Sequence, residues 1–451
     1  MLTDQDLRDF REDRLKYFPF IHIPETTTAA QLRSARPITC AAIQATCFKA
    51  HPHQEELSRQ VRKMLAERIL VDGERSLDLL LGVLVLMAWS MHSTHGGKAH
   101  LVSTSGLARP LVSNLRLDKP PYSAGCASAG PIPEDKGSAT NEERRALLAC
   151  FALSAMVGLA MKYDPMRWSA QVEEACYRLI QDEENEGDKT LVYMARIARL
   201  SVSTAAISRR ALEDPEFRRH AILSVGSLKA ALEQLKGTIP SELSEHSTIA
   251  AYLCSVEVAI YELALYHHPA SPSTSTNSLS SSEPEVESRR IAYLTTLLLV
   301  CQSYIEFFLT SDIIYITAPT MLVFPYCLKI AYKLQTLKTP AWDPALSRAV
   351  LDPVRCLERA AQAAEVGNET LKARIGEDSV FKAMAETLRK SAPIWRVNVD
   401  VEQEVGMERD TGMQDVAVEP SHLSGNVGEL NGSWMNADFS SDFWLSGSFD
   451  F

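Results

Sequence analysis

Apolar residues recur every three to four positions along most of the chain. Leu57, Val61, Leu65 and Ile69 are four residues apart with polar residues between them, and Gly73 follows. This spacing places the four side chains on one face of a helix that ends near the glycine. The same period runs through residues 142–161, 189–212, 248–266 and 347–365. Alternating patterns typical of strands are almost absent, so the sequence predicts an all-α fold of several layered helices.

Two apolar runs, residues 77–89 and 291–309, resemble membrane-spanning helices at first sight. The first is short, and the second contains Gln302, Ser303 and Glu306. Neither is a run of about 20 apolar residues, which a bilayer requires. We therefore expect both runs to be helices buried on all sides, and we expect no membrane partner.

Segments rich in Pro, Gly and Ser interrupt the helical pattern. Residues 118–141 predict a loop, and residues 269–288 predict a flexible insertion rich in Ser, Thr and Pro. The predicted organisation is a helical domain in two parts around this insertion, followed by a tail of different composition. The parts are residues 1–268, 269–288, 289–396 and 397–451.

The tail holds almost all of the net charge of the 451-residue chain, which is −11. Residues 397–451 contain eleven Asp or Glu and a single Arg, a net charge of −10, and the boundary falls near Trp395. The tail also carries six aromatic residues without helical or strand period: Trp434, Phe439, Phe443, Trp444, Phe449 and Phe451. This acidic and aromatic composition is typical of disordered activation segments. A strap that packs back on the domain is the alternative.

The cysteines and the N-terminus favour a reducing compartment. The nine cysteines are an odd number, and most lie within apolar runs, so we interpret them as small buried side chains. Residues 1–18 are charged throughout and have no apolar core, so we expect no secretory signal peptide.

No motif of nucleotide-binding proteins, zinc proteases or serine hydrolases occurs in the sequence. The histidines that lie close together are His51 and His53, His92 and His95, and His267 and His268. None of these pairs has further ligands nearby in the sequence, so we interpret them as helix-end or surface residues. We therefore predict no catalytic residue, no metal site and no cofactor, and we do not expect an enzyme.

The acidic run 182–188 is the basis of the main enzymatic alternative, an all-helical prenyl-diphosphate cyclase. Its carboxylates could hold magnesium around a diphosphate. However, the run begins with one aspartate where the cyclase motif has two, and the segment from Asn368 has Leu371 and Lys372 where that motif requires Ser. A solvated acidic loop before a helix at Thr190 is the simpler interpretation.

Several segments together resemble a known family. They are residues 10–45, 74–89, 111–121, 143–169 and 314–337. Their order is similar to that of the helical regulatory region, or middle homology region, of fungal transcription factors. In that family an opening segment that ends in a proline precedes a long apolar helix, a proline-rich turn and a helix that starts with Glu-Arg-Arg. The resemblance covers most of residues 5–390 and implies a helical regulatory domain.

The sequence departs from this family at one important point. Such factors usually begin with six cysteines that hold two zinc ions and place a helix in the major groove, but Cys40 and Cys47 have no CxxC neighbours. Direct DNA binding is therefore doubtful. Basic clusters at 208–220 and 287–290 are interleaved with acids and predict a solvated helix face. Zinc-free regulators of this kind are similar to those of trichothecene-type secondary-metabolite gene clusters.

The resemblance and the tail together predict a nuclear transcriptional regulator of a fungal secondary-metabolite gene cluster. Its helical body would form a homodimer, dock on a DNA-bound partner factor or sense a metabolite. The six aromatic residues of the tail would bind the transcription machinery or a co-activator. The alternatives are an interaction or scaffold protein without a role in transcription and, third, the cyclase.

Overall fold

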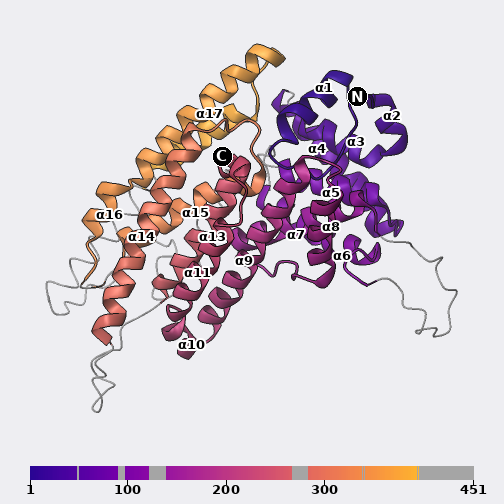
Figure 1. The fold of residues 1–451 in the computed structure, drawn as a ribbon. Coiled ribbons are helices and arrows are strands. Elements are labelled where there is room, and N and C mark those ends of the chain that lie inside the picture. Colours follow the sequence, from indigo (N-terminus) through magenta and orange to yellow (C-terminus); the bar gives the residue numbers. More distant parts are fainter. Residues whose placement is uncertain are drawn as a thin grey trace, which may run out of the picture.

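The protein is described by a computed structural model that covers residues 1–47, 50–89, 97–120, 139–266, 283–337, 339, 341–393 and 395. Helices account for 78% of these residues, and no strand occurs among them. The all-α prediction is confirmed. Figure 1 shows the N-terminal helices at one side of the molecule, the C-terminal helices at the other, and α7, α9 and α13 between them.

The N-terminal part contains the apolar helix α5, which packs against α3 and α6. Its elements are α1 (Asp4–Asp9), η1 (Phe10–Arg14), α2 (Ala29–Ala35), α3 (Pro37–Thr46), α4 (His51–Ala66), η2 (Glu67–Val71), α5 (Leu77–Trp89) and α6 (Gly97–Asn114). The buried carboxylate of Asp78 accepts hydrogen bonds from the N–H groups of Ile38 and Thr39, both at 2.9 Å. These are unpaired donors of the first turn of α3, so α5 caps α3. Gly82 allows the close approach, because a Cβ there would lie 2.7 Å from the Ile38 side chain.

The central part is built around α7, which is buried along most of its length. Its elements are α7 (Asn141–Met161), α8 (Ala170–Asp182), α9 (Gly187–Glu213), α10 (Pro215–His220), α11 (Leu223–Lys236), α12 (Ser241–Ser244), α13 (Ser247–Glu262) and η4 (Leu263–Leu265). Helix α7 packs against α8 and α9 and also touches α5, α6 and α15. It therefore links the N-terminal part to the C-terminal part (Figure 1).

The C-terminal part forms an outer layer over α13. Its elements are α14 (Glu283–Thr310), α15 (Ala318–Gln335), α16 (Pro344–Val350) and α17 (Pro353–Ile375), followed by a helix over residues 380–393. Helix α14 packs against α13 and α15 on its inner side and touches α16 and α17.

The predicted breaks agree with the structure at one place and differ at the other. Helix α6 ends at Asn114 and α7 begins at Asn141, on either side of the predicted loop. The predicted insertion, residues 269–288, extends into a helix, because α14 already begins at Glu283. The carboxylate of Glu285 pairs with Arg289 at 2.7 Å, one turn further on, and stabilises this first part of the helix. The tail, residues 397–451, lies outside the described residues.

The apolar helices differ in how far the rest of the chain covers them. By length and composition alone, α7, α13 and α14 could each cross a membrane, and the buried share of the apolar window is 89%, 72% and 39% respectively. The shorter helix α5 is buried from Asp78 to Trp89, as predicted. The prediction of complete burial for residues 291–309 is wrong, because α14 is at the edge of the molecule and Leu299 is 51% exposed.

The described cysteines are free thiols, and all but Cys254 are buried. This confirms their interpretation as small core side chains; Cys126 lies outside the described residues. Burial raises the pKa of Cys150 and of Cys176 to about 12, so these thiols stay protonated at neutral pH.

Candidate functional site

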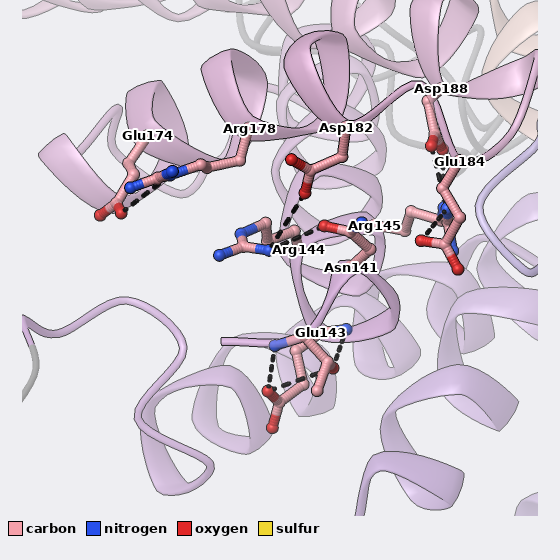
Figure 2. A network of polar contacts seen from close by, with 10 residues as sticks. Asn141, Glu143, Arg144, Arg145, Glu174, Arg178, Asp182, Glu184 and Asp188 are labelled. Atoms are coloured by element: carbon pink, nitrogen blue, oxygen red, sulfur yellow. Dashed lines mark hydrogen bonds and ion pairs between the residues drawn. The ribbon is translucent and has the colours of Figure 1, made fainter. Parts of the chain in front are cut away.

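The Glu-Arg-Arg segment begins α7 with a capping box. The Thr140 hydroxyl accepts a hydrogen bond from the Glu143 N–H at 3.2 Å, and the Glu143 carboxylate accepts one from the Thr140 N–H at 2.9 Å. Two donors at the start of the helix are thereby paired. The next two residues, Arg144 and Arg145, lie against the junction between α8 and α9 (Figure 2).

Arg145 makes a buried ion pair with Asp188 in the first turn of α9. Its Nε lies 2.6 Å and its Nη2 2.9 Å from the two carboxylate oxygens, and both side chains are 2% exposed. Glu184 accepts a further hydrogen bond from Arg145 at 3.0 Å. Burial acts to lower the pKa of Arg145, but the two carboxylates raise it above its ordinary value. The guanidinium is therefore charged and fixes the start of α9 on α7.

Arg144 extends this network toward the end of α8. It donates to the side-chain oxygen of Asn141 at 2.7 Å and lies 3.9 Å from the carboxylate of Asp182. On the outer side of α8, Arg178 lies 3.8 Å from Glu174. Figure 2 shows the acidic side chains of the α8–α9 junction turned toward the two arginines of α7. We call Arg144, Arg145, Asp182, Glu184 and Asp188 the junction network.

The interpretation of the acidic run as a solvated loop is wrong only for Asp188, since the other four carboxylates of the run are exposed. Asp188 is buried, and two of the other carboxylates are paired with arginine. The network also argues against a magnesium site, because arginine already provides the positive charge. In the described part of the chain, no group of three or more His, Cys, Asp or Glu is placed to hold a metal ion.

The second segment that a cyclase would need has a local role in the structure. The buried side chain of Asn368 accepts a hydrogen bond from the Ser379 N–H at 2.8 Å and donates one to Asp378 at 3.0 Å. It therefore closes the loop after α17. Helix α17 packs against α14 and α15, whereas the acidic run joins α8 and α9, which pack against α7.

A second buried charge lies at the other end of α7. The carboxylate of Glu262, at the end of α13, accepts hydrogen bonds from Lys162 at 3.0 Å, Lys333 at 3.3 Å and the Tyr326 hydroxyl at 2.5 Å. Burial acts to raise the pKa of Glu262, but the two ammonium groups hold it well below its ordinary value. This cluster joins α7, α13 and α15 through a charged group that is itself 1% exposed.

A cavity of about 570 Å³ lies between the N-terminal helices and the end of α17. Its wall includes Phe10, Arg14, His53, Tyr315 and Arg374. The buried guanidinium of Arg14 donates to the backbone oxygen of Thr46, and burial lowers its pKa to about 10. Arg374 pairs with Asp9 at the rim. Because the wall carries charges of both signs, it does not favour one class of ligand.

The two basic clusters are partly built into the fold. Arg218 donates to the backbone oxygens of Ala211 and Leu212, at 2.9 and 3.0 Å, and so caps the end of α9. Arg290 is buried and pairs with Glu287 at 3.0 Å. The prediction of a solvated helix face is therefore wrong for Arg290, because this side chain connects α14 to the core.

Comparisons with known proteins show similarity to named fungal transcription factors. A family model described as a C-terminal domain matches residues 314–450. The transcription factor opdL of Penicillium oxalicum is 28% identical over 429 residues, which are 90% of this chain and 73% of that protein. The chain is similar to fungal transcription factors. This confirms the resemblance given by the sequence segments and supports the prediction of a transcriptional regulator.

Two further relatives have the same kind of name but match less of the chain. The transcription factor himD of Aspergillus japonicus is 24% identical over 271 residues, 59% of this chain and 45% of that protein. A transcription factor of Aspergillus terreus is 24% identical over 274 residues, 58% of this chain and 38% of that protein. The chain thus spans less than half of these two relatives. No solved structure matches the chain.

The predicted site residues belong to a part of the chain that the structure does not describe, so their prediction stays untested. The six aromatic residues of the tail and His92, His95, His267 and His268 lie outside the described residues. His51 and His53 are at the start of α4, and His53 lies at the cavity rim. The Glu262 cluster is not predicted from the sequence. Its only signal is a Glu within the apolar run 248–266, which also contains Glu257, and the two lysines that pair with Glu262 are far away in sequence.

Proposed function

We propose that this chain regulates transcription in a fungal nucleus through protein contacts and that its targets belong to a secondary-metabolite gene cluster. The similarity to a protein named as a transcription factor over 90% of the chain carries this proposal. The junction network, with its buried Arg145–Asp188 pair, and the Glu262 cluster support it as well, because they use charged side chains to hold helices together. Such a body suits docking on a partner factor more than catalysis.

The tail is the part that would recruit the transcription machinery or a co-activator. The matched family model runs to residue 450 and thus includes most of the acidic and aromatic segment. Each large aromatic side chain buried by a partner contributes on the order of 1.5 to 3 kcal/mol. Ordering of the segment on binding costs about 2 to 5 kcal/mol, so the affinity should be micromolar. Asp438, Asp442 and Asp450 would keep the aromatics exposed and speed encounter with a basic partner.

A reporter assay tests this role of the tail. Residues 397–451, fused to a heterologous DNA-binding domain, should activate a reporter gene. Changing Phe443 and Trp444 to Ala should remove most of the activity, whereas Asp442→Asn should remove less. A silent fusion, together with a lower melting temperature of the full chain carrying the double Ala change, would indicate a structural strap. That result would favour the scaffold function.

Binding to DNA should depend on a partner factor. We expect the purified chain to carry no stoichiometric zinc and to bind duplex DNA weakly and without sequence preference, since acids interleave the basic clusters. A gel-shift titration at physiological salt measures this. A sequence-selective complex at about 10⁻⁸ M or tighter, the range of specific binders, would contradict the proposal.

Localisation and turnover separate this function from the alternatives. A fluorescent fusion of the full chain should accumulate in the nucleus of a fungal host. Exclusion from the nucleus would favour a scaffold protein. Magnesium-dependent turnover of a prenyl diphosphate would favour the cyclase.

A further inference from the structure

Helix α14 is as apolar as a membrane-spanning helix, yet less than half of its apolar window is buried. Its inner side packs against α13 and α15. Its outward side is a line of residues at spacings of three and four, which lie on one face of a helix. We call this line the α14 face; it consists of Arg289, Ala292, Thr296, Leu299, Ser303 and Glu306. All are exposed except Thr296, which is partly buried.

The α14 face is uncharged in its centre and oppositely charged at its two ends. No charged residue occurs between Ile291 and Ile305. At one end Arg289 pairs with Glu285 at 2.7 Å, and its side chain is 51% exposed. At the other end Glu306 accepts two hydrogen bonds from Arg359, at 2.5 and 2.7 Å, and its side chain is 50% exposed. Each of these two charged side chains is thus about half exposed to solvent, although each is already paired within the chain.

We propose that a second copy of this chain covers the α14 face, with the two α14 helices antiparallel across a twofold axis. In an antiparallel pair, the residue number on one helix rises as the number of the facing residue on the other helix falls, so the two numbers have a constant sum. The register that sets Arg289 opposite Glu306 of the partner subunit also sets Ala292 opposite Ser303 of the partner subunit and Thr296 opposite Leu299 of the partner subunit. One register thus pairs the charges and places the uncharged centre around the axis.

The pattern of charge favours a second copy over other occupants. A twofold interface must be complementary to itself, and a face with Arg at one end and Glu at the other meets this condition in the antiparallel orientation only. A lipid surface is bound by helices whose polar face is rich in Lys and Arg. The α14 face has one cation and one anion, so it is better suited to its own copy.

Neighbouring side chains provide the additional area that a stable dimer needs. The face from Arg289 to Glu306 is a single row of side chains about 26 Å long at 1.5 Å per residue. A standard interface buries roughly 800 Å² per partner, which one row of side chains does not supply. Tyr293, Val300 and Phe307 of α14 are partly exposed, and α16, which touches α14, exposes Leu346. These apolar groups extend the surface to both sides of the line.

The inference deepens the proposed function, since it specifies how the helical body would form a homodimer, but its test measures mass and not transcription. Light scattering on the full chain should give about 100 kDa, twice the chain mass of 50.0 kDa. Leu299→Glu places two carboxylates near the axis and should weaken association by about a hundredfold or more. Val366→Glu on α17, where the side chain is 59% exposed, is the matched control and should stay dimeric.

A cysteine substitution tests the antiparallel register. In this register, Thr296 is separated from Thr296 of the partner subunit by three residues along the axis, about 4.5 Å. Thr296→Cys should therefore form a disulfide-linked dimer under mild oxidation, whereas Val366→Cys and the unaltered chain should not. Leu299→Gln replaces Leu299→Glu if circular dichroism shows that the latter does not fold.

Three results would overturn the inference. The first is a monomeric mass at every concentration up to about 100 µM, well above the micromolar range of weak specific pairs. The second is a dimer that persists in Leu299→Glu. The third is a monomer that binds anionic vesicles through Leu299, which would make the α14 face a lipid contact. A silent tail fusion would contradict the proposed function and leave the dimer intact.

Discussion

Helices α7 and α14 have the same mean hydropathy, 1.5 over their most apolar window, but the chain buries 89% of that window in α7 and 39% in α14. Helix α7 has neighbours on all sides, namely α5, α6, α8, α9 and α15, whereas the helices that touch α14 leave its outward face open. Hydropathy shows how much apolar surface must be covered. It does not show whether the same chain covers it, and for α14 we propose a second copy.

The charged groups of the two helices differ in the same way. Arg145 of α7 and its partner Asp188 are each 2% exposed, while Arg359 and its partner Glu306 on α14 are 41% and 50% exposed. Both pairs are bidentate. A buried charge that loses its partner has no water to replace it, but an exposed one does. Comparing the two pairs therefore tests how burial changes the contribution of an ion pair to the free energy of unfolding.

The largest effect is expected for the buried pair. Arg145→Ala leaves the Asp188 carboxylate buried without its main partner and should lower the free energy of unfolding by about 3–5 kcal/mol. Arg359→Ala removes an exposed pair and should lower it by at most about 1 kcal/mol. Urea unfolding followed by circular dichroism measures both. Equal losses would mean that water reaches Asp188 and that the junction network is not closed.

A pair of leucines tests the same contrast without charge. Leu153 on α7 is fully buried, and Leu299 on α14 is half exposed. Leu153→Ala should cost about 2–5 kcal/mol, since it leaves a cavity. Leu299→Ala should stay within about 0.5 kcal/mol at low protein concentration, where self-association does not contribute. A large loss at Leu299 under these conditions would show that α14 is more tightly packed than its exposure indicates.

The sequence predicts much of α7 and little of how α14 is covered. The 3.6-residue period and the Pro/Gly/Ser segment before Asn141 are local signals, and they place α7 correctly. Exposure of α14 depends on α13 and α15, which contact only its inner side. No pattern within residues 291–309 contains that information, so complete burial was the wrong expectation.

The charged clusters also show that local sequence patterns do not reveal contacts between distant segments. Thr140 and Glu143 are three residues apart, a spacing that indicates a capping box from sequence alone. The partners of Glu262, in contrast, are Lys162 and Lys333, which are 100 and 71 residues away. Such pairs form only when distant helices pack. In the acidic run 182–188, the arginine that pairs with Glu184 and Asp188 likewise lies about 40 residues earlier, on α7.

The next largest effect is expected from acid, which should weaken the Glu262 cluster and lower the free energy of unfolding. The pKa of Glu262 is held well below its ordinary value of 4.5 despite burial. A depressed carboxylate pKa means that its contribution to stability is complete above pH 4.5 and is lost as the pH falls below it. The loss is at most about 1.4 kcal/mol per pH unit for one proton.

The comparison of Glu262→Gln with Glu306→Gln isolates this contribution. Unfolding free energies measured from pH 6 to pH 3 should fall less steeply for Glu262→Gln than for the unaltered chain, because the variant has no proton to take up at this site. Glu306→Gln removes a half-exposed carboxylate on α14 and should leave the slope nearly unchanged. Parallel curves for all three proteins would show that Glu262 does not titrate differently in the folded and unfolded states.

The smallest effect is expected at the start of α7, where the cap fixes the first turn. Thr140→Ala removes the hydroxyl that accepts a hydrogen bond from the Glu143 N–H and should lower the free energy of unfolding by about 1 kcal/mol. Thr140→Ser keeps that oxygen and should cost much less. Ser303→Ala on the α14 face removes an exposed hydroxyl in the middle of a helix. The free energy of unfolding should change there by no more than about 0.5 kcal/mol. If Thr140→Ala is as mild as Ser303→Ala, the start of α7 is held by the junction network alone, and the hydroxyl of Thr140 adds nothing to it.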